Sequence, residues 1–198
     1  MKKLWMVVAV GLWMGMSPVL SAQGTITVEA CLPCHGVGAA GVPGAPPIPR
    51  LDGQHADYLT RQLREFKSGK RKNDLMAPLV GAMKKGQMPA LAAHFAGLTP
   101  VRGAVENAQL AVRGKALYEE GNQANGLPGC VGCHLPNGVG SARYPRLAGQ
   151  RQTYIVQQLT NFKSGARTND RASVMRYVAG RLTDEEMRAV AEYLAGLY

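Results

Sequence analysis

The chain contains four cysteines, which occur in two copies of one arrangement, with a histidine directly after the second cysteine of each pair. The copies read Cys31-Leu32-Pro33-Cys34-His35 and Cys130-Val131-Gly132-Cys133-His134. Two thiols at this spacing can bond the two vinyl groups of one haem, and the adjacent imidazole can then reach the iron from one side. The sequence therefore predicts two covalently bound haem c groups, attached through Cys31, Cys34, Cys130 and Cys133 and ligated by His35 and His134.

Other uses of paired cysteines explain this pattern less well. Zinc sites built from two such pairs usually space them by about 15 to 20 residues. Here 95 residues separate the pairs, and zinc does not account for the two histidines. Disulfides suit an exported protein but require no histidine after each pair. A thioredoxin-like redox motif is expected within a βαβ pattern, and none is visible. Haem attachment is the favoured interpretation.

The second axial position on each iron separates electron carriers from catalysts, because an open position admits a reactant. A methionine thioether fills this position and raises the reduction potential. The sequence nominates Met76 and Met175, because each lies 41 residues beyond its motif histidine. Met88 stays a rival in the first half of the chain, since the Met88-Pro89 pair resembles the ligand loop of some single-haem cytochromes.

The remaining methionines and histidines have simpler interpretations. Met88 and Met187 fall on the expected faces of final helices, where a methionine is normally a core residue. Met83 has no methionine counterpart in the second half. His55 and His94 have no histidine counterparts, so we expect both at the surface rather than on an iron.

An internal repeat with a period near one hundred residues predicts two homologous domains. The cysteine motifs are 99 residues apart, and so are Met76 and Met175, whereas the block between them repeats at an offset of 96. That block pairs residues 50–54 with 146–150, and Tyr58, Gln62, Leu63, Phe66, Lys67, Ser68 and Gly69 with Tyr154, Gln158, Leu159, Phe162, Lys163, Ser164 and Gly165. We predict domains over residues 23–99 and 108–198, joined by a linker over 100–107 that Pro100 and Gly103 punctuate.

Each half consists of expected helices joined by loops rich in glycine and proline, without clear strand alternation, so we predict an all-α fold. In the middle helix of each half, apolar residues recur at i, i+4 and i+7 and form one stripe. These residues are Leu59, Leu63 and Phe66 in the first half and Ile155, Leu159 and Phe162 in the second.

The helix ends differ between the halves. Thr183 to Glu186 forms a capping box at the start of the last helix, and the second half should open with a helix near residues 108–120. The last helix of the first half lacks such a cap, and we expect it to begin near Met88, because Pro89 is tolerated only in a first turn. The short segment before Cys31 leaves little room for an opening helix, so we expect the first half to be less stable.

The beginning of the chain and its charge indicate where the protein works. Lys2 and Lys3 precede an apolar run of about a dozen residues, too short for the roughly 20 of a spanning helix, so residues 1–22 are predicted to be a cleaved signal peptide. Its removal lowers the formal net charge from +10 to about +8. We therefore expect a periplasmic protein whose partners present an acidic face or a membrane surface, and we exclude nucleic acid.

These features together resemble the dihaem cytochrome c4 family of class I cytochromes c. The resemblance rests on both haem motifs, the repeated Leu-x-Gly-Gln block, Asn-Asp followed by Met, and the Ala-Gly-Leu helix ends. It implies two tandem cytochrome c-like domains, each wrapped around one haem, with propionates near the domain interface. It also implies the axial pairs His35 with Met76 and His134 with Met175, and electron transfer from a quinol-oxidising complex towards a terminal oxidase.

Three functions remain open at this point. The first is a diffusing electron carrier that binds redox proteins and catalyses no reaction itself. The second is the dihaem cytochrome subunit of a periplasmic dehydrogenase, similar to that of flavocytochrome c sulfide dehydrogenase. The third is a haem enzyme, which needs one open iron; short loops and the lack of a further cysteine ligand disfavour it.

Overall fold

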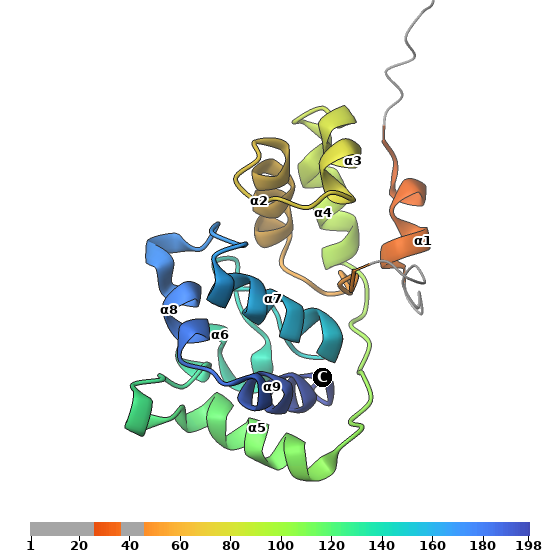
Figure 1. Cartoon of the computed structure of the whole chain (residues 1–198). Coiled ribbons are helices and arrows are strands. Elements are labelled where there is room, and N and C mark those ends of the chain that lie inside the picture. Colours follow the sequence, from red (N-terminus) through yellow and green to blue (C-terminus); the bar gives the residue numbers. More distant parts are fainter. Residues whose placement is uncertain (1–25, 37–45) are drawn as a thin grey trace, which may run out of the picture.

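The structure is a computed structural model that describes residues 26–36 and 46–198. The predicted signal peptide, residues 1–22, lies outside the described residues. Within the described part the chain is helical and contains no strand, which confirms the all-α prediction. The helices form two bodies that follow one another along the chain (Figure 1). None of the described helices is long and apolar enough to cross a bilayer.

The two bodies share a common order of helices, with one addition. The first contains a 3-10 turn η1 and four helices: η1 (Val28–Ala30), α1 (Leu32–His35), α2 (Ala56–Lys67), α3 (Met76–Ala82) and α4 (Gln87–Ala96). The second contains α5 (Ala108–Glu120), η2 (Gln123–Asn125), α6 (Val131–His134), η3 (Pro136–Gly138), α7 (Gln152–Ser164), η4 (Arg171–Ser173), α8 (Val174–Gly180) and α9 (Asp184–Ala195). By the sequence repeat, α1 to α4 correspond to α6 to α9. Helix α5 has no helical counterpart among the described residues of the first body.

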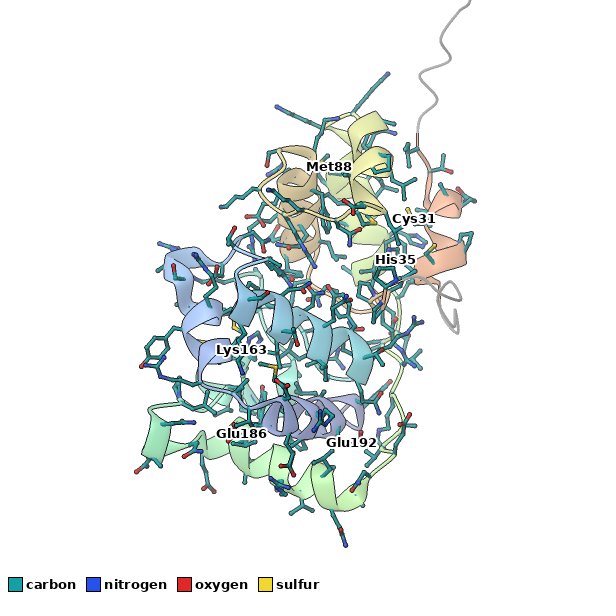
Figure 2. The ribbon with its side chains drawn as sticks, viewed as in Figure 1. Cys31, His35, Met88, Lys163, Glu186 and Glu192 are labelled. Carbon is teal, nitrogen blue, oxygen red and sulfur yellow. The ribbon has the colours of Figure 1, made fainter. Side chains whose placement is uncertain are left out.

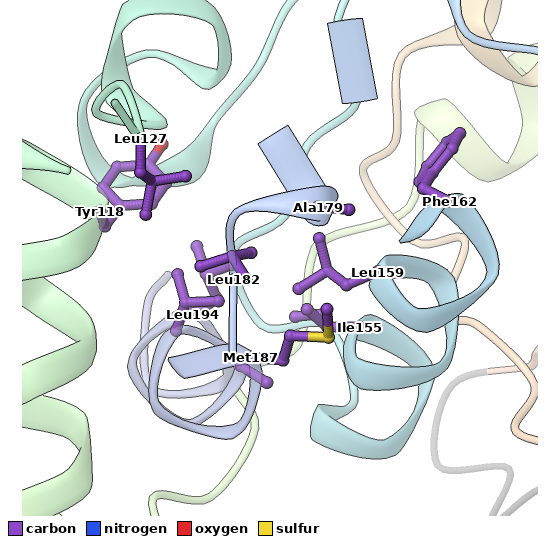
Figure 3. Close-up of a cluster of buried hydrophobic side chains, with 11 residues drawn as sticks. Tyr118, Leu127, Ile155, Leu159, Phe162, Ala179, Leu182, Met187 and Leu194 are labelled. Atoms are coloured by element: carbon purple, nitrogen blue, oxygen red, sulfur yellow. The ribbon is translucent and has the colours of Figure 1, made fainter. Parts of the chain in front are cut away.

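The second half has one continuous core, which Figure 3 shows in close-up. The predicted stripe Ile155, Leu159 and Phe162 on α7 is buried in it and meets Met187 and Leu194 of α9. Helix α5 lies along the opposite side of α9 (Figure 1). Its predicted bounds, residues 108–120, are those observed.

The first half has two smaller core clusters instead of one. Val80, Met83, Met88 and Leu91 form the first, and Met76 packs against it. Leu59, Ala92 and Phe95 form the second, and Cys31 packs against it. Of the predicted stripe on α2, Leu59 is buried, whereas Leu63 and Phe66 are partly buried. The segment around Val28 packs against both clusters.

The helix caps agree with the sequence in the second half and add a detail in the first. Thr183 and Glu186 form the predicted capping box, with each side chain bonded to the other's backbone N–H. Helix α4 begins at Gln87, one residue before the expected start, and no side chain caps it. However, the backbone N–H of Lys84 donates to Gln87 Oε1 over 2.8 Å. Since Lys84 and Gln87 align with Thr183 and Glu186, half of a capping box is present in the first half.

Candidate haem sites

The two motif histidines occupy matching environments on α1 and α6. Each is nearly buried, with 9% of His35 and 6% of His134 exposed. His35 Nδ1 lies 2.9 Å from the carbonyl oxygen of Pro49, and His134 Nδ1 lies 3.0 Å from that of Pro145. Burial lowers the pKa of both imidazoles. Because a carbonyl oxygen only accepts, Nδ1 must carry the proton, which leaves the lone pair on Nε2 for a metal.

The cysteines lie beside these histidines on single helical turns. Figure 2 shows Cys31 and His35 on the side of α1 that faces the rest of the first half. No disulfide joins any of the four cysteines. Burial raises the pKa of the Cys31 thiol, and it raises that of Cys130 to about 11. A thiol–disulfide redox motif needs a lowered thiol pKa, so the thioredoxin-like interpretation loses support.

The four cysteines also do not gather into a metal site of their own. Within residues 26–36 and 46–198 no group of three or more His, Cys, Asp and Glu side chains is placed to hold a metal ion. The two pairs instead lie in different halves, on α1 and α6 (Figure 1). The zinc alternative, which needs both pairs at one ion, therefore does not fit this arrangement.

An unpaired buried donor supplies a further test of the haem assignment. Arg146 follows Pro145, the acceptor of His134, and its Nε is buried without a hydrogen-bond partner in the described part of the chain. A buried guanidinium nitrogen needs an acceptor. An anionic group such as a haem propionate suits that donor, so the residues around His134 fit a haem.

The candidate methionines form two pairs that differ in burial. Met88 and Met187 occupy matching positions on α4 and α9 and are both completely buried. Met76 and Met175 lie at the start of α3 and near the start of α8, and both are only partly buried at the edge of a core cluster. The cluster beside Met175 also packs against Cys130. The paired burial of Met88 and Met187 favours a core role for Met88.

Two lysines hold the helices that carry Met76 and Met175. Lys67 Nζ donates to the carbonyl oxygen of Met83 over 2.6 Å, at the end of α3. Lys163 Nζ donates to that of Leu182 over 2.7 Å, beyond the end of α8 (Figure 2). A cation at a helix C-terminus satisfies carbonyls that have no partner within the helix. The two lysines therefore fix α3 and α8 against α2 and α7.

Two glutamines join the halves through a reciprocal exchange. Gln54 accepts from the backbone N–H of Arg146 and donates to its carbonyl, over 2.8 and 2.9 Å. Gln150 does the same with the backbone of Arg50, over 2.9 and 3.0 Å. Because Gln54 aligns with Gln150 and Arg50 with Arg146, the two halves meet about a pseudo-twofold axis.

A second reciprocal contact uses buried arginines. Arg71 donates to Tyr154 Oη over 2.8 Å, and Arg167 donates to Tyr58 Oη over 3.3 Å. Each guanidinium also stacks on the phenylalanine of its own half, with 4.6 Å to the Phe66 ring and 4.5 Å to the Phe162 ring. Burial alone would raise the pKa of Tyr58, but the charges of Arg167 and Arg71 outweigh it and lower the pKa.

The symmetry fails at one carboxylate. Glu65 is 9% exposed, accepts from Gln62 and from Asn169 of the other half, and lies 3.4 Å from Lys70 Nζ. Its counterpart in the second half is the neutral Asn161. The interface therefore places a buried negative charge on the side of the first half alone.

These interface roles were not predicted from the sequence. Tyr58 and Gln62 each align with an identical residue in the second half, and polar residues repeated in both halves were a usable signal. His94 is exposed as predicted, whereas His55 is half-buried and its Nε2 donates to the carbonyl oxygen of Val139 over 2.9 Å. His55 is therefore less exposed than His94, because it lies where the halves meet.

Known proteins resemble this chain over most of its length. A family model described as cytochrome c matches residues 22–100 and again residues 111–197. Cytochrome c4 of Pseudomonas aeruginosa is 37% identical over 181 residues, which cover 90% of this chain and 89% of the relative. A thiosulfate dehydrogenase electron acceptor of Thiomonas intermedia is 34% identical over 198 residues, which cover 98% of this chain and 91% of the relative.

Solved structures agree with these relatives. The crystal structure of reduced recombinant cytochrome c4 from Pseudomonas stutzeri superposes with a TM-score of 0.79 at 36% identity, covering 86% of this chain and 95% of that one. A thiosulfate dehydrogenase from Marichromatium purpuratum gives a TM-score of 0.76 at 33% identity, covering 89% of this chain but only 38% of that longer one. The repeated match, with one haem motif in each half, shows that this chain belongs to the cytochrome c family as a dihaem cytochrome c4, with two tandem domains and two covalently bound haem c groups.

Proposed function

We propose that this dihaem electron carrier works in the periplasm with both irons closed, by His35 and Met76 in the first domain and by His134 and Met175 in the second. Haem attachment is assigned to Cys31, Cys34, Cys130 and Cys133. A haem iron with both axial positions filled changes oxidation state without binding a reactant. The chain's own residues supply a neutral imidazole, a thioether and a buried environment.

The observation that carries this proposal is the matched state of the two histidines. The carbonyl oxygens of Pro49 and Pro145 each accept a hydrogen bond from a histidine Nδ1–H, so both Nε2 lone pairs are available to a metal. The methionine assignment is supported by burial, since Met88 and its counterpart Met187 are wholly enclosed in the two cores. Lys67 and Lys163 make matching contacts at the ends of α3 and α8, the helices that carry Met76 and Met175.

Substitution of the methionines tests the axial pairs. Met76→Ala and Met175→Ala should each remove one of the two methionine-to-iron charge-transfer bands and lower the potential of one haem, because a soft ligand that favours the reduced iron is lost. Visible spectra during a redox titration measure both effects. Met88→Leu and Met187→Leu are the controls, because they change volume little in the two cores. Loss of a band in Met88→Leu with both bands kept in Met76→Ala would reassign the first ligand.

The partners are the finer part of the proposal. We infer transfer from a quinol-oxidising complex towards a terminal oxidase, with the positive charge of the chain favouring acidic docking faces. Two relatives named as thiosulfate dehydrogenase electron acceptors favour a second candidate, in which the chain takes electrons as a subunit of a dehydrogenase. Either role makes the protein an acceptor and donor of single electrons.

Native purification separates these two roles. A diffusing carrier should elute alone and be reduced rapidly by solubilised quinol-oxidising complex in stopped-flow absorbance measurements. A dehydrogenase subunit should co-purify with its catalytic partner and be reduced by that partner's substrate, with thiosulfate as the first choice. Rapid binding of carbon monoxide to either reduced haem would contradict closed irons and favour the enzyme alternative.

A further inference from the structure

The last helices of the two domains are covered differently. On α9, Ala189 is completely buried and Glu192 is 6% exposed, because α5 lies over them. The aligned residues on α4 are Ala90 and Ala93, and both are exposed. The same helix face is thus a core surface in the second domain and an open one in the first.

Three features of α5 explain how it fits α9. Gly114 faces Ala189 so closely that a Cβ on it would lie 1.9 Å from the Ala189 carbonyl oxygen. Arg113 pairs with Glu185 near the start of α9. Glu192, labelled in Figure 2, accepts from the backbone N–H groups of Glu106 and Asn107, just before α5. Helix α5 therefore fits α9 through a small residue, Gly114, where the two helices cross, and through a charged residue, Arg113, next to it.

A groove occupies the corresponding place in the first domain. It has a volume of about 330 Å³ and is lined by residues 26–29 on one side and by Gln87, Ala90 and Leu91 of α4 on the other. Most of the exposed lining surface is apolar, although the lining includes one exposed acidic residue, Glu29. Since η1 leads directly into Cys31, the groove lies beside the first haem-attachment motif.

The charge next to this groove is the reverse of that on α9. Asp184, Glu185 and Glu186 begin α9, whereas Lys85, Gly86 and Gln87 hold the aligned positions before and at the start of α4, and Lys84 aligns with Thr183. Lys84 and Lys85 are exposed and pair with no carboxylate in the described part of the chain. Glu185, the partner of Arg113, aligns with Gly86, which directly follows these two lysines. A helix placed like α5 would therefore meet positive charge near the position where Arg113 meets negative charge.

We propose that this groove binds an acidic amphipathic helix of a partner protein, with a small residue against Ala90 and a carboxylate facing Lys84 and Lys85. Residues 1–25 of this chain do not have the chemistry of this occupant, because they contain two lysines but no Asp or Glu. A second copy is disfavoured as well, since it would bring the same exposed lysines together. The inference does not depend on which methionines ligate the irons.

A peptide derived from α5 provides the probe. We would label a peptide of residues 107–121 that carries Arg113→Glu and titrate it with the mature holoprotein, following fluorescence anisotropy. Saturable binding is expected, about tenfold tighter than that of the unchanged Arg113 peptide, because Arg113→Glu replaces a charge that the lysines repel with one that they attract. The peptide that also carries Gly114→Leu should not bind, since the helix could no longer approach α4 closely.

Variants of the protein locate the site. Ala90→Gln should weaken binding about tenfold, whereas Ala116→Gln, at an exposed position on α5, should leave it unchanged. Lys84→Glu with Lys85→Glu should reverse the preference, so that the Arg113 peptide binds more tightly. Unchanged haem spectra would confirm that each variant is folded.

Several outcomes would overturn the proposal. They are the lack of saturable binding, binding insensitive to Ala90→Gln, and a charge reversal that leaves the peptide preference as it was. A dimer in light scattering that Ala90→Gln dissociates would assign the groove to a second copy.

Discussion

The two domains carry the same haem-binding elements, but the helices that pack around these elements differ. In the second, α5 covers α9 and one continuous core joins α7, α8 and α9. In the first, two clusters take the place of that core and the face of α4 around Ala90 is open. The matched geometry of His35 and His134 shows that the histidine sites survive this difference. Helix α5 therefore contributes to the stability of the second domain and covers a surface of α9, but it is not needed for the geometry of the histidine site.

The interface between the domains likewise combines contacts that are repeated in both halves with one residue that differs. Gln54 with Gln150, and Arg71 with Arg167, make reciprocal contacts about a pseudo-twofold axis. Glu65 has no acidic counterpart, so one buried carboxylate lies near Lys70 and Arg71 of its own half and accepts from the neutral Asn169 of the other. A duplicated sequence can keep its interface while a single substitution makes the electrostatics of the two sides unequal.

Gly114 offers the strongest test of what α5 contributes. Gly114→Val should destabilise the second domain by about 3 kcal/mol or more, because the new side chain would meet the backbone of α9 at Ala189. Urea unfolding followed by haem absorbance and by helical circular dichroism measures this loss. Gly180→Ala is the matched control in the same domain, since no atom lies within 4 Å of its added Cβ. Equal stability of Gly114→Val and Gly180→Ala would mean that α5 does not hold the second domain together.

The buried arginines test the unequal interface. Arg167→Ala should cost about 2 kcal/mol through lost hydrogen bonds to Tyr58 and Gln62. Arg71→Ala should cost about 1 kcal/mol more, because it also removes a cation near the buried Glu65. Urea unfolding of both variants in the wild-type and Glu65→Asn backgrounds forms a double-mutant cycle. A difference that persists in Glu65→Asn would show that the carboxylate is not its source.

Features that depend on interactions between residues close in sequence could be predicted. The helix over residues 108–120, the Thr183 capping box and the buried stripe on α7 follow from neighbouring residues and are observed. The contact between His55 and Val139 did not follow, because it depends on how two separate domains meet. The face of α4 is exposed because no helix among the described residues of the first domain takes the place of α5. No pattern within α4 itself could predict this.

The helix caps give the smallest and most local test of the comparison. Lys84→Thr should stabilise the first domain by about 1 kcal/mol, because its hydroxyl can cap α4 while Gln87 already accepts from the backbone N–H of residue 84. Thr183→Ala should destabilise the second domain by a similar amount. Hydrogen exchange at the first amides of α4 and α9 measures both changes in the same protein. Lys85→Thr removes the same charge as Lys84→Thr but cannot complete the box, so equal protection in these two variants would mean that charge rather than capping limits the start of α4.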